Sequence, residues 1–218
     1  MAQAFPHQFI AIEGNIGAGK TTLCKMLERD YPCRLVLEEF ADNPFLSYFY
    51  DNPERYAFPV ELFFLTERHK QLQEHLIQKD LFQETVVADY YFVKTLLFAQ
   101  NNLNTEEYRL FQRLFHILNA SFPKPDLLVY LHRPVEHLIR NIQRRGRAYE
   151  LEIPSSYLES IQESYQDYFR STDDLPILLI ELGDCDFWSH EDQYFELTEM
   201  IRKKYSPGLH RRRLRAYL

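Results

Sequence analysis

The segment GNIGAGKT, residues 14–21, constrains the fold of this chain more than any other part of its sequence. It continues the apolar run QFIAI and fits the pattern G-x-x-x-x-G-K-[ST] through Gly14, Gly19, Lys20 and Thr21. Glycines let consecutive backbone N–H groups turn toward an anion, and a helix after the loop adds its own free N–H groups. The strand–loop–helix context predicts a nucleoside triphosphate site, most simply for ATP. The alternative is a glycine-rich turn without a ligand.

Each polar residue of this loop has an expected role toward a triphosphate. The Lys20 ammonium can reach the β- and γ-phosphates, which makes Lys20 a catalytic candidate, and the Thr21 hydroxyl can ligate Mg²⁺. The remaining residues expected to bind the triphosphate are Gly14, Asn15, Gly17, Ala18, Gly19, Thr22 and, from a basic segment further along the chain, Arg144.

The loop alone does not identify the reaction, because GTPases, ATPases and small-molecule kinases share it. A GTPase would also carry the motifs D-x-x-G and N-K-x-D, and neither occurs in this sequence. Transfer of a phosphoryl group to a small acceptor is therefore the leading hypothesis.

The composition argues against several other classes of protein. The 218-residue chain has a net charge of -7, which disfavours a nucleic acid polymer as partner, because such binding neutralises phosphates. No apolar run approaches the roughly 18 residues of a membrane span, so we expect no membrane partner. The cysteines Cys24, Cys33 and Cys185 lack C-x-x-C spacing, and the N-terminus lacks an export signal. We therefore expect free thiols and a cytoplasmic location.

Short apolar runs alternate with helical segments along the whole chain. The apolar runs predict five strands at residues 8–14, 33–39, 85–89, 125–131 and 176–182. Because these runs are continuous, they are typical of parallel strands covered on both faces. We predict an α/β fold of the P-loop kinase type: one domain over residues 1–218, with a five-stranded parallel sheet and helices on both faces.

Helices are expected at residues 20–30, 45–50, 54–79, 90–100, 105–120, 134–145, 154–169 and 191–204. The basic residues 206–218 are expected to form a solvated C-terminal tail, with a contact surface as the alternative. Ligands of doubly wound sheets bind at the carboxyl ends of the strands, so residues that follow the strands are candidate site residues.

Carboxylates end the second and third predicted strands. Glu38 and Glu39 end the second, and since neighbouring strand residues point to opposite faces, only one of them can face the site. That carboxylate could act as a general base toward an acceptor hydroxyl, whereas an acceptor phosphate would need cations instead. The alternative is a pair of solvated carboxylates. Asp89 ends the third strand and can serve the site, cap the next helix, or both.

Glu61 lies in the apolar segment VELFFL, and Arg68 is two helical turns further on, on the same helix face. A carboxylate among apolar neighbours is either paired or functional. Glu61 is therefore predicted either to pair with Arg68 or to read the hydrogen-bonding edge of a base.

A cluster of arginines follows the fourth predicted strand. Arg140, Arg144 and Arg147 recur at i, i+4 and i+7, with Arg145 beside them. In a phosphoryl-transfer enzyme such a cluster is expected to form a mobile lid, here about residues 140–152, whose guanidinium groups cover the phosphates. The alternative is an exposed basic helix face.

Taken together, the sequence resembles the deoxynucleoside kinase family, in particular its bacterial deoxyadenosine/deoxyguanosine kinase branch. The resemblance covers about residues 8–200 and is carried by IEGNIGAGKTTL, EEFADNPFLSYFYDNPERYAFPVELFFLTER, ADYYFVKTLLFA, PDLLVYL and RRGRAYELEIPSSYLE. The first segment is widely shared, whereas the second and the last are specific to the family. The resemblance implies transfer of the γ-phosphoryl group of ATP to the 5′-hydroxyl of a deoxynucleoside, in nucleotide salvage, by a homodimer that uses Mg²⁺.

The resemblance also implies roles for individual residues. Glu38 would take the proton of the 5′-hydroxyl, and the spacing to the following DNP favours it over Glu39. Arg145 and Arg147 match the catalytic lid arginines. The residues that would contact the nucleoside are Tyr50 and Glu150 at the 3′-hydroxyl, Glu61 with Arg68 at the base, and Ile16 and Phe98 along the cleft.

The sequence departs from the family pattern at two places. The family commonly has Arg-Ser after the acidic residue that ends the third strand, whereas two tyrosines follow Asp89 here. Lys94 or Arg68 could take the place of the missing arginine. Asn141 stands where another lid arginine is common, and Arg140 could compensate.

Two rival functions remain at this stage. A nucleoside monophosphate kinase of the thymidylate kinase type shares the fold and the loop but needs cations at its acceptor. A regulatory nucleotide-binding module that has lost catalysis is supported only by the missing arginine.

Two finer expectations concern the substrate and the assembly. An ionised Glu61 only accepts hydrogen bonds, which fits the amines of adenine, cytosine and guanine better than thymine, and we expect a purine, deoxyadenosine first. The helical segments 90–100 and 106–118 carry more apolar residues than one buried face needs. That excess fits either a dimer interface or a wide contact with the core.

Overall fold

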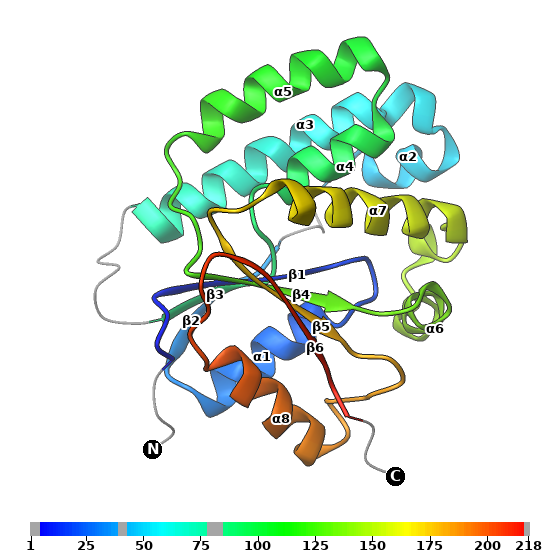
Figure 1. Ribbon diagram of the computed structural model, residues 1–218. Helices are drawn as coiled ribbons and strands as arrows, with labels where there is room; N and C mark the ends of the chain where they lie inside the picture. The colour runs from blue at the N-terminus through cyan, green and yellow to red at the C-terminus, as the bar shows by residue number, and fades with distance from the viewer. Residues whose placement is uncertain (1–4, 39–42, 78–84, 216–218) are drawn as a thin grey trace.

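The computed structural model of the protein describes residues 5–38, 43–77 and 85–215, to which all structural statements below apply. One parallel sheet forms the centre of the molecule, with strand order β2-β3-β1-β4-β5-β6 (Figure 1). The strands are β1 Phe9–Gly14, β2 Cys33–Val36, β3 Thr85–Ala88, β4 Leu127–His132, β5 Pro176–Glu181 and β6 Gly208–Arg213. This arrangement confirms the predicted α/β class, although the sheet has six strands and not five.

Helices cover both faces of the sheet, with α2, α3, α4, α5 and α7 over one face and α1 and α8 over the other (Figure 1). Their bounds are α1 Lys20–Asp30, α2 Leu46–Asp51, α3 Pro53–Leu72, α4 Lys94–Asn102, α5 Thr105–Asn119, α6 Val135–Arg145, α7 Ser155–Ser171 and α8 Glu191–Ile201. A π-helical turn, η1 Gln73–Ile77, extends α3, and a 3-10 turn, η2 Ala148–Glu150, follows α6. Every predicted helix is present, with ends shifted by a few residues, although residues 78 and 79 of the predicted helix 54–79 lie outside the described residues.

Strand β1 shows why the apolar runs are continuous. Phe9 and Ala11 pack in the cluster under α3, α4 and α7, whereas Ile10 and Ile12 pack in the cluster with α1 and α8. Because successive strand residues point to opposite faces and both faces are covered, every position of the strand is buried. In the described part of the chain, no helix is long and apolar enough to cross a membrane.

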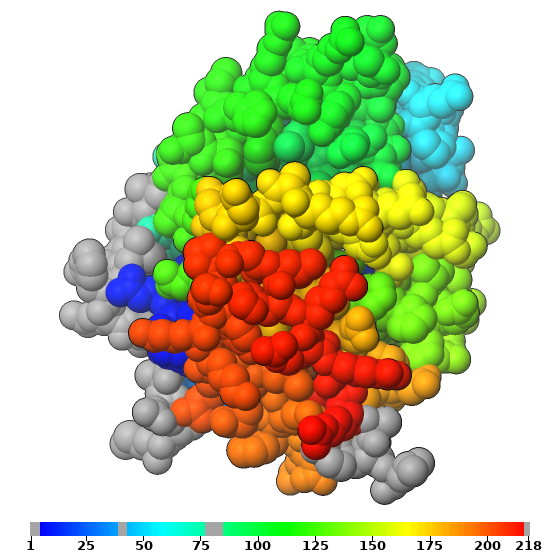
Figure 2. Space-filling model, viewed as in Figure 1, coloured from blue at the N-terminus to red at the C-terminus, as the bar shows by residue number. Residues whose placement is uncertain are grey.

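The prediction of a solvated tail over residues 206–218 is wrong for the part that the structure describes. Residues Gly208–Arg213 form β6, which pairs parallel with β5 so that Leu209 lies opposite Ile177. Figure 2 shows this strand (red) on the surface beside α8 (orange). The sequence hides the strand because its second half consists of exposed arginines, which are compatible with the edge of a sheet.

Replacing Leu214 with alanine tests this sixth strand. Leu214 directly follows β6, is 3% exposed and packs in the cluster with α1 and α8, so its loss should lower the free energy of unfolding by about 2–4 kcal/mol. The neighbouring control Arg213→Ala changes an exposed side chain and should stay within about 0.5 kcal/mol of the wild type. Chemical denaturation measures both changes, and equal stabilities for the two variants would contradict the placement of β6.

Candidate active site

The phosphate loop joins β1 to α1 at the carboxyl end of the sheet. Gly17 and Gly19 have φ angles of 80° and 98°, in the left-handed region that favours glycine. A Cβ atom at Gly17 would also lie 2.8 Å from the carbonyl oxygen of Leu138 in α6. Glycine is therefore required both by the backbone conformation and by the close packing of the loop against α6.

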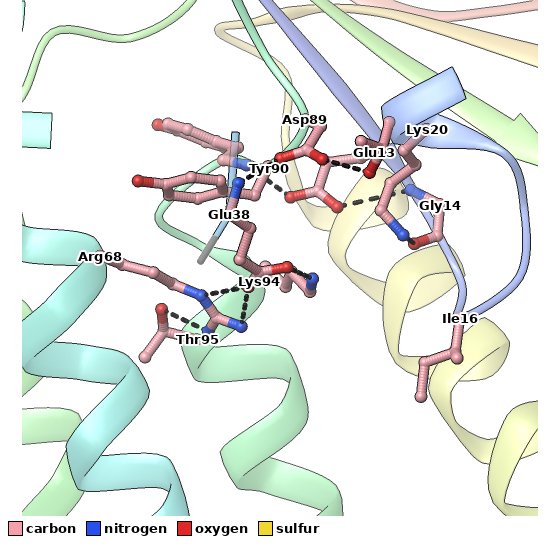
Figure 3. Close-up of polar contacts among 12 residues, drawn as sticks. Glu13, Gly14, Ile16, Lys20, Glu38, Arg68, Asp89, Tyr90, Lys94 and Thr95 are labelled. Carbon is pink, nitrogen blue, oxygen red and sulfur yellow. Dashed lines mark hydrogen bonds and ion pairs between the residues drawn. The ribbon is translucent and has the colours of Figure 1, made fainter. Parts of the chain in front are cut away.

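Lys20 is held by the loop that precedes it. Its Nζ donates to the carbonyl oxygens of Gly14 at 2.9 Å and Asn15 at 3.0 Å (Figure 3). Asn15 in turn donates from Nδ2 to the carbonyl oxygen of Leu158 in α7, at 2.7 Å. Burial, together with the charge of Lys94, lowers the pKa of Lys20 to about 8. An anion beside Lys20 would favour its charged form.

A cavity of about 600 Å³ opens beside the phosphate loop. Its walls come from the loop, from helices α2, α3, α4, α6 and α7, and from the segment before α8. Most of the predicted site residues line it: Ile16, Gly17, Ala18, Gly19, Lys20, Thr21, Thr22, Tyr50, Glu61, Arg68, Phe98, Arg144, Arg145, Arg147 and Glu150. The predicted residues Gly14, Asn15, Glu38 and Asp89 are not among the lining residues, and Glu38 lines a second pocket instead.

The cavity has further lining residues that the sequence analysis missed. They are Leu46, Phe49, Val60, Phe64, Asn102, Tyr157 and Trp188. Most are apolar or aromatic residues of helices, which cannot be told from core residues by periodicity. Asn102 could have been recognised from the sequence, because it is a polar residue at the end of an apolar helical segment.

Glu38 follows β2 and is buried in a cluster of charges (Figure 3). Arg68 donates to Glu38 Oε1 from Nε at 2.7 Å and from Nη2 at 2.5 Å, and Lys94 Nζ donates to Oε2 at 2.5 Å. Burial raises the pKa of Glu38, but the charges of Arg68 and Lys94 outweigh burial and lower the pKa to about 2. Glu38 is therefore ionised, and both cations that hold it line the cavity. Glu39, the other candidate base, lies outside the described residues.

Asp89 links the phosphate loop to the end of β2. Its Oδ2 accepts a hydrogen bond from the Thr21 hydroxyl at 2.5 Å, and its Oδ1 accepts one from the Glu38 N–H at 2.7 Å. The prediction that Asp89 caps the next helix is wrong, because α4 begins only at Lys94 and Val93 is its N-cap. Asp89 therefore holds the Thr21 side chain and the Glu38 backbone in place.

Among the described residues, no hydrogen bond or ion pair joins Glu61 to Arg68. The Arg68 guanidinium group instead donates to Glu38 and, from Nη1, to Thr95 Oγ1 at 2.9 Å. The predicted Glu61–Arg68 ion pair is therefore wrong. Instead, Glu61 Oε1 accepts a hydrogen bond from Asn102 Nδ2 at 2.6 Å, and its buried Oε2 has no hydrogen-bond partner. Burial raises the pKa of Glu61 to about 7.

Three arginines of the predicted lid, Arg144, Arg145 and Arg147, line the cavity. Arg144 and Arg145 are also exposed to solvent, so the predicted lid and the alternative of an exposed basic face are both compatible with their positions. Arg145 and Arg147 both form ion pairs with Glu150, the latter at 3.2 Å. Arg144 lies over the ring of Trp188, with its guanidinium carbon 4.8 Å from the ring centroid.

The suggestion that Arg140 replaces a lid arginine is not supported by its position. Its Nη2 lies 3.7 Å from Asp184 Oδ1, its side chain is 64% exposed, and it does not line the cavity. Asn141 does line the cavity and donates from Nδ2 to the Gly17 carbonyl oxygen at 2.9 Å. Asn141 thus stabilises the phosphate loop through this hydrogen bond.

This arrangement defines a P-loop phosphotransferase. A phosphate loop and an arginine-rich segment line one cavity at the carboxyl end of a parallel sheet, and two further lining residues, Arg68 and Lys94, hold the buried carboxylate of Glu38. The family model of deoxynucleoside kinase matches residues 10–205, and the chain belongs to this family. It is an ATP-dependent deoxynucleoside kinase.

Two relatives from Bacillus subtilis (strain 168) are similar over nearly their whole length. Deoxyguanosine kinase is 33% identical over 202 residues, which cover 89% of this chain and 96% of the relative. Deoxyadenosine/deoxycytidine kinase is 27% identical over 205 residues, which cover 89% of this chain and 92% of the relative.

The fold is also that of a solved structure, deoxyadenosine kinase from M. mycoides with bound dATP. The TM-score is 0.74 at 21% identity, and the match covers 89% of this chain and 99% of the other. At this identity the likeness establishes the shared fold.

Proposed function

We propose that this kinase transfers the γ-phosphoryl group of ATP to the 5′-hydroxyl of a purine deoxynucleoside, with deoxyadenosine favoured, and so serves nucleotide salvage. One observation carries the proposal: Glu38 is an ionised carboxylate that Asp89 links to the phosphate-loop residue Thr21. A positioned carboxylate suits a hydroxyl acceptor, which must lose a proton. The same carboxylate would repel an acceptor phosphate, which disfavours a nucleoside monophosphate kinase.

The acceptor nucleoside would occupy the part of the cavity between the phosphate loop and α3. Ile16 and Phe98 would contact its faces, and Tyr50 and Glu150 would hold the 3′-hydroxyl. Both polar residues line the cavity, and the Tyr50 ring stacks on Tyr149, the neighbour of Glu150 in sequence, with centroids 6.1 Å apart. Burial raises the pKa of Tyr50, so its hydroxyl keeps a proton to donate.

The triphosphate of ATP would bind along residues 17–22, with Lys20 beside the β- and γ-phosphates. The Thr21 hydroxyl and the Asp89 carboxylate, 2.5 Å apart, are hard oxygen ligands that fit Mg²⁺. Among the described residues, no group of three or more His, Cys, Asp or Glu side chains could hold a metal ion. Mg²⁺ usually binds through one or two protein ligands, water and phosphate oxygens, and it neutralises phosphate charge there.

Residues 140–152 would act as a lid, with Arg145 and Arg147 as the catalytic arginines. Gly146 between them has a φ of 70°, which lets α6 end and the chain turn. Both arginines are ion-paired with Glu150, so binding of a 3′-hydroxyl to that carboxylate would compete with the pairs and favour movement of the arginines toward the phosphates.

Lys94 would replace the arginine that is missing after Asp89. It holds Glu38 Oε2 at 2.5 Å and also lines the cavity, so it can exchange the carboxylate for an incoming phosphate oxygen. That exchange would remove one of the charges that keep the pKa of Glu38 low and so strengthen the base when a phosphate is present.

The described part of the chain also supports the remaining proposals on assembly and location. Helix α5 exposes Leu110 and Ile117, at 51% and 72%, which fits a homodimer interface, whereas Leu97 and Ala99 of α4 are buried in the core. Residues 1–218 would form one kinase domain around the single sheet. The cysteines at positions 24, 33 and 185 are free thiols, as suits the proposed cytoplasmic location.

Replacing Glu38 with alanine tests the general base. We expect kcat for deoxynucleoside phosphorylation to fall by roughly 10²–10⁴-fold with a small change in KM, because proton transfer is lost. Steady-state assays with ATP, Mg²⁺ and each of the four deoxynucleosides measure this, and Glu39→Ala is the control that should retain turnover. Efficient transfer to a deoxynucleoside monophosphate would instead support the rival kinase type, and thymidine as the best substrate would refute the purine preference.

Replacing Lys94 with alanine tests its proposed role beside the transferring phosphate. Turnover should fall by roughly tenfold or more, since one charge-assisted contact to the phosphates is lost. Lys70→Ala, which removes an exposed lysine of α3, is the control. Unchanged turnover of a correctly folded Lys94→Ala protein, checked by circular dichroism, would dismiss the role.

Replacing Ile117 with glutamate tests the dimer. A charge in an apolar interface is unfavourable, so the variant should elute as a monomer where the wild type is a dimer, as measured by light scattering after gel filtration. The matched control Phe195→Glu alters a 64%-exposed residue of α8, on the other face of the sheet. A wild-type monomer, or a dimeric Ile117→Glu protein, would refute this interface.

A further inference from the structure

The free oxygen of Glu61 is the most informative unpaired group in the cavity. Glu61 is 2% exposed, lies in the middle of α3 and lines the cavity. Its Oε1 accepts a hydrogen bond from Asn102 Nδ2, whereas its Oε2 is buried with no hydrogen-bond partner. A buried polar atom without a partner is unfavourable, so the unpaired oxygen of this cavity-lining residue points to a ligand atom.

Asn102 makes the two oxygens of Glu61 different. An amide N–H group donates to Oε1, so Oε1 is an acceptor in every protonation state of the carboxyl group. A proton taken up by Glu61 is therefore placed on Oε2, the oxygen without a partner. Protonated Glu61 then offers a donor and an acceptor side by side, and ionised Glu61 offers two acceptors.

We propose that Asn102 is a positioning residue that makes Glu61 a selector between two kinds of base: protonated Glu61 selects adenine or cytosine, and ionised Glu61 selects guanine. This inference rests on the proposed function and names how the same site chooses its substrate. Adenine and cytosine present an unprotonated ring nitrogen beside an amine, which matches a donor beside an acceptor. Guanine presents a ring N–H beside an amine, which matches two acceptors.

The mismatched combinations are unfavourable for a simple reason. Protonated Glu61 would set its O–H against the N–H of guanine, and ionised Glu61 would set a charged oxygen against the ring-nitrogen lone pair of adenine. A site built from buried polar groups rejects a ligand that leaves those groups unpaired. The protonation state of one carboxyl group therefore acts on the two purines in opposite directions.

Both states are accessible near neutral pH. Burial raises the pKa of Glu61 to about 7, although the charge of Arg68, the bond from Asn102 and the charge of Lys94 lower it and Glu38 raises it. These groups come from α3, from α4 and from the end of β2. Glu38, whose pKa is about 2, keeps its charge between pH 6 and 9.

The remaining titratable neighbours come from α2 and α7. Tyr50 and Tyr157 both face Glu61, and burial raises the pKa of each, so both stay neutral over this range. Lys20, with a pKa of about 8, lies at the phosphate loop and acts on both substrates alike. The ratio of kcat/KM for deoxyadenosine to kcat/KM for deoxyguanosine therefore isolates Glu61.

The pH dependence of this ratio tests the proposal in the wild-type protein. Because Glu61 loses its proton as the pH rises through about 7, the ratio should fall with increasing pH, by up to about tenfold per pH unit. Deoxycytidine should follow deoxyadenosine. A ratio that stays constant from pH 6 to 9 while transfer proceeds would overturn the proposal. Absence of transfer to any deoxynucleoside at any pH would overturn the proposed function instead.

Glu61→Gln tests the identity of the titrating group. Asn102 would orient the Gln amide with its oxygen toward Asn102 and its N–H₂ in the place of Oε2, as in protonated Glu61. Across the whole pH range, the ratio in this variant should stay at the value that the wild type shows at low pH. The matched control Glu67→Gln, also in α3 but outside the cavity, should keep the wild-type pH dependence. A pH-dependent ratio in Glu61→Gln would assign the effect to another group and overturn the proposal.

Asn102→Ala separates positioning from a merely structural role. Loss of the bond to Oε1 removes an interaction that favours ionised Glu61 and so raises its pKa. The midpoint of the pH-dependent fall of the ratio should therefore move to higher pH. The double variant Glu61→Gln with Asn102→Ala frees the amide to flip and should reduce the preference for deoxyadenosine that Glu61→Gln shows. An unchanged midpoint together with an unchanged preference would overturn the role of Asn102.

Discussion

The buried charge cluster of Glu38, Arg68 and Lys94 holds together the elements that form the cavity. The three side chains are 2%, 4% and 5% exposed, and they join the end of β2 to α3 and α4. Removing one partner would leave an uncompensated buried charge, which typically costs about 3–5 kcal/mol. The contacts that position Glu38 also lower its pKa. Glu38 is therefore a weak base as long as both cations hold it, and a ligand that draws a cation away would raise its pKa.

A second network explains why Lys94 is the residue that reaches Glu38. Glu13, fully buried in β1, accepts hydrogen bonds from the Tyr91 N–H at 2.6 Å and the Tyr165 hydroxyl at 2.7 Å. The bond from Tyr91 ties the turn after β3 to the sheet, and the bond from Tyr165 ties α7 to it. Helix α4 starts only at Lys94. Lys94, the first residue of α4, is thereby placed where its Nζ donates to Glu38 Oε2 at 2.5 Å.

The cavity region contains two carboxyl groups with opposite environments. Cations surround Glu38 and lower its pKa to about 2, whereas burial dominates at Glu61 and raises its pKa to about 7. Neighbouring carboxyl groups whose pKa values are pushed apart commonly serve different roles. Here the environment of Glu38 keeps it ionised, and that of Glu61 lets it gain or lose a proton near neutral pH.

The sequence by itself determined the phosphate loop, the α/β class and most residues of the cavity, because these depend on local patterns: glycine spacing, apolar periodicity and the residues at strand ends. It could not determine that Arg68 pairs with Glu38 and not with Glu61, or that Asp89 bonds Thr21 and the Glu38 N–H without lining the cavity. It also hid β6, whose arginines mask an edge strand, and the partnership of Asn102 with Glu61. Only the tertiary structure decided these, since they join residues from different elements and depend on how helices pack across the sheet.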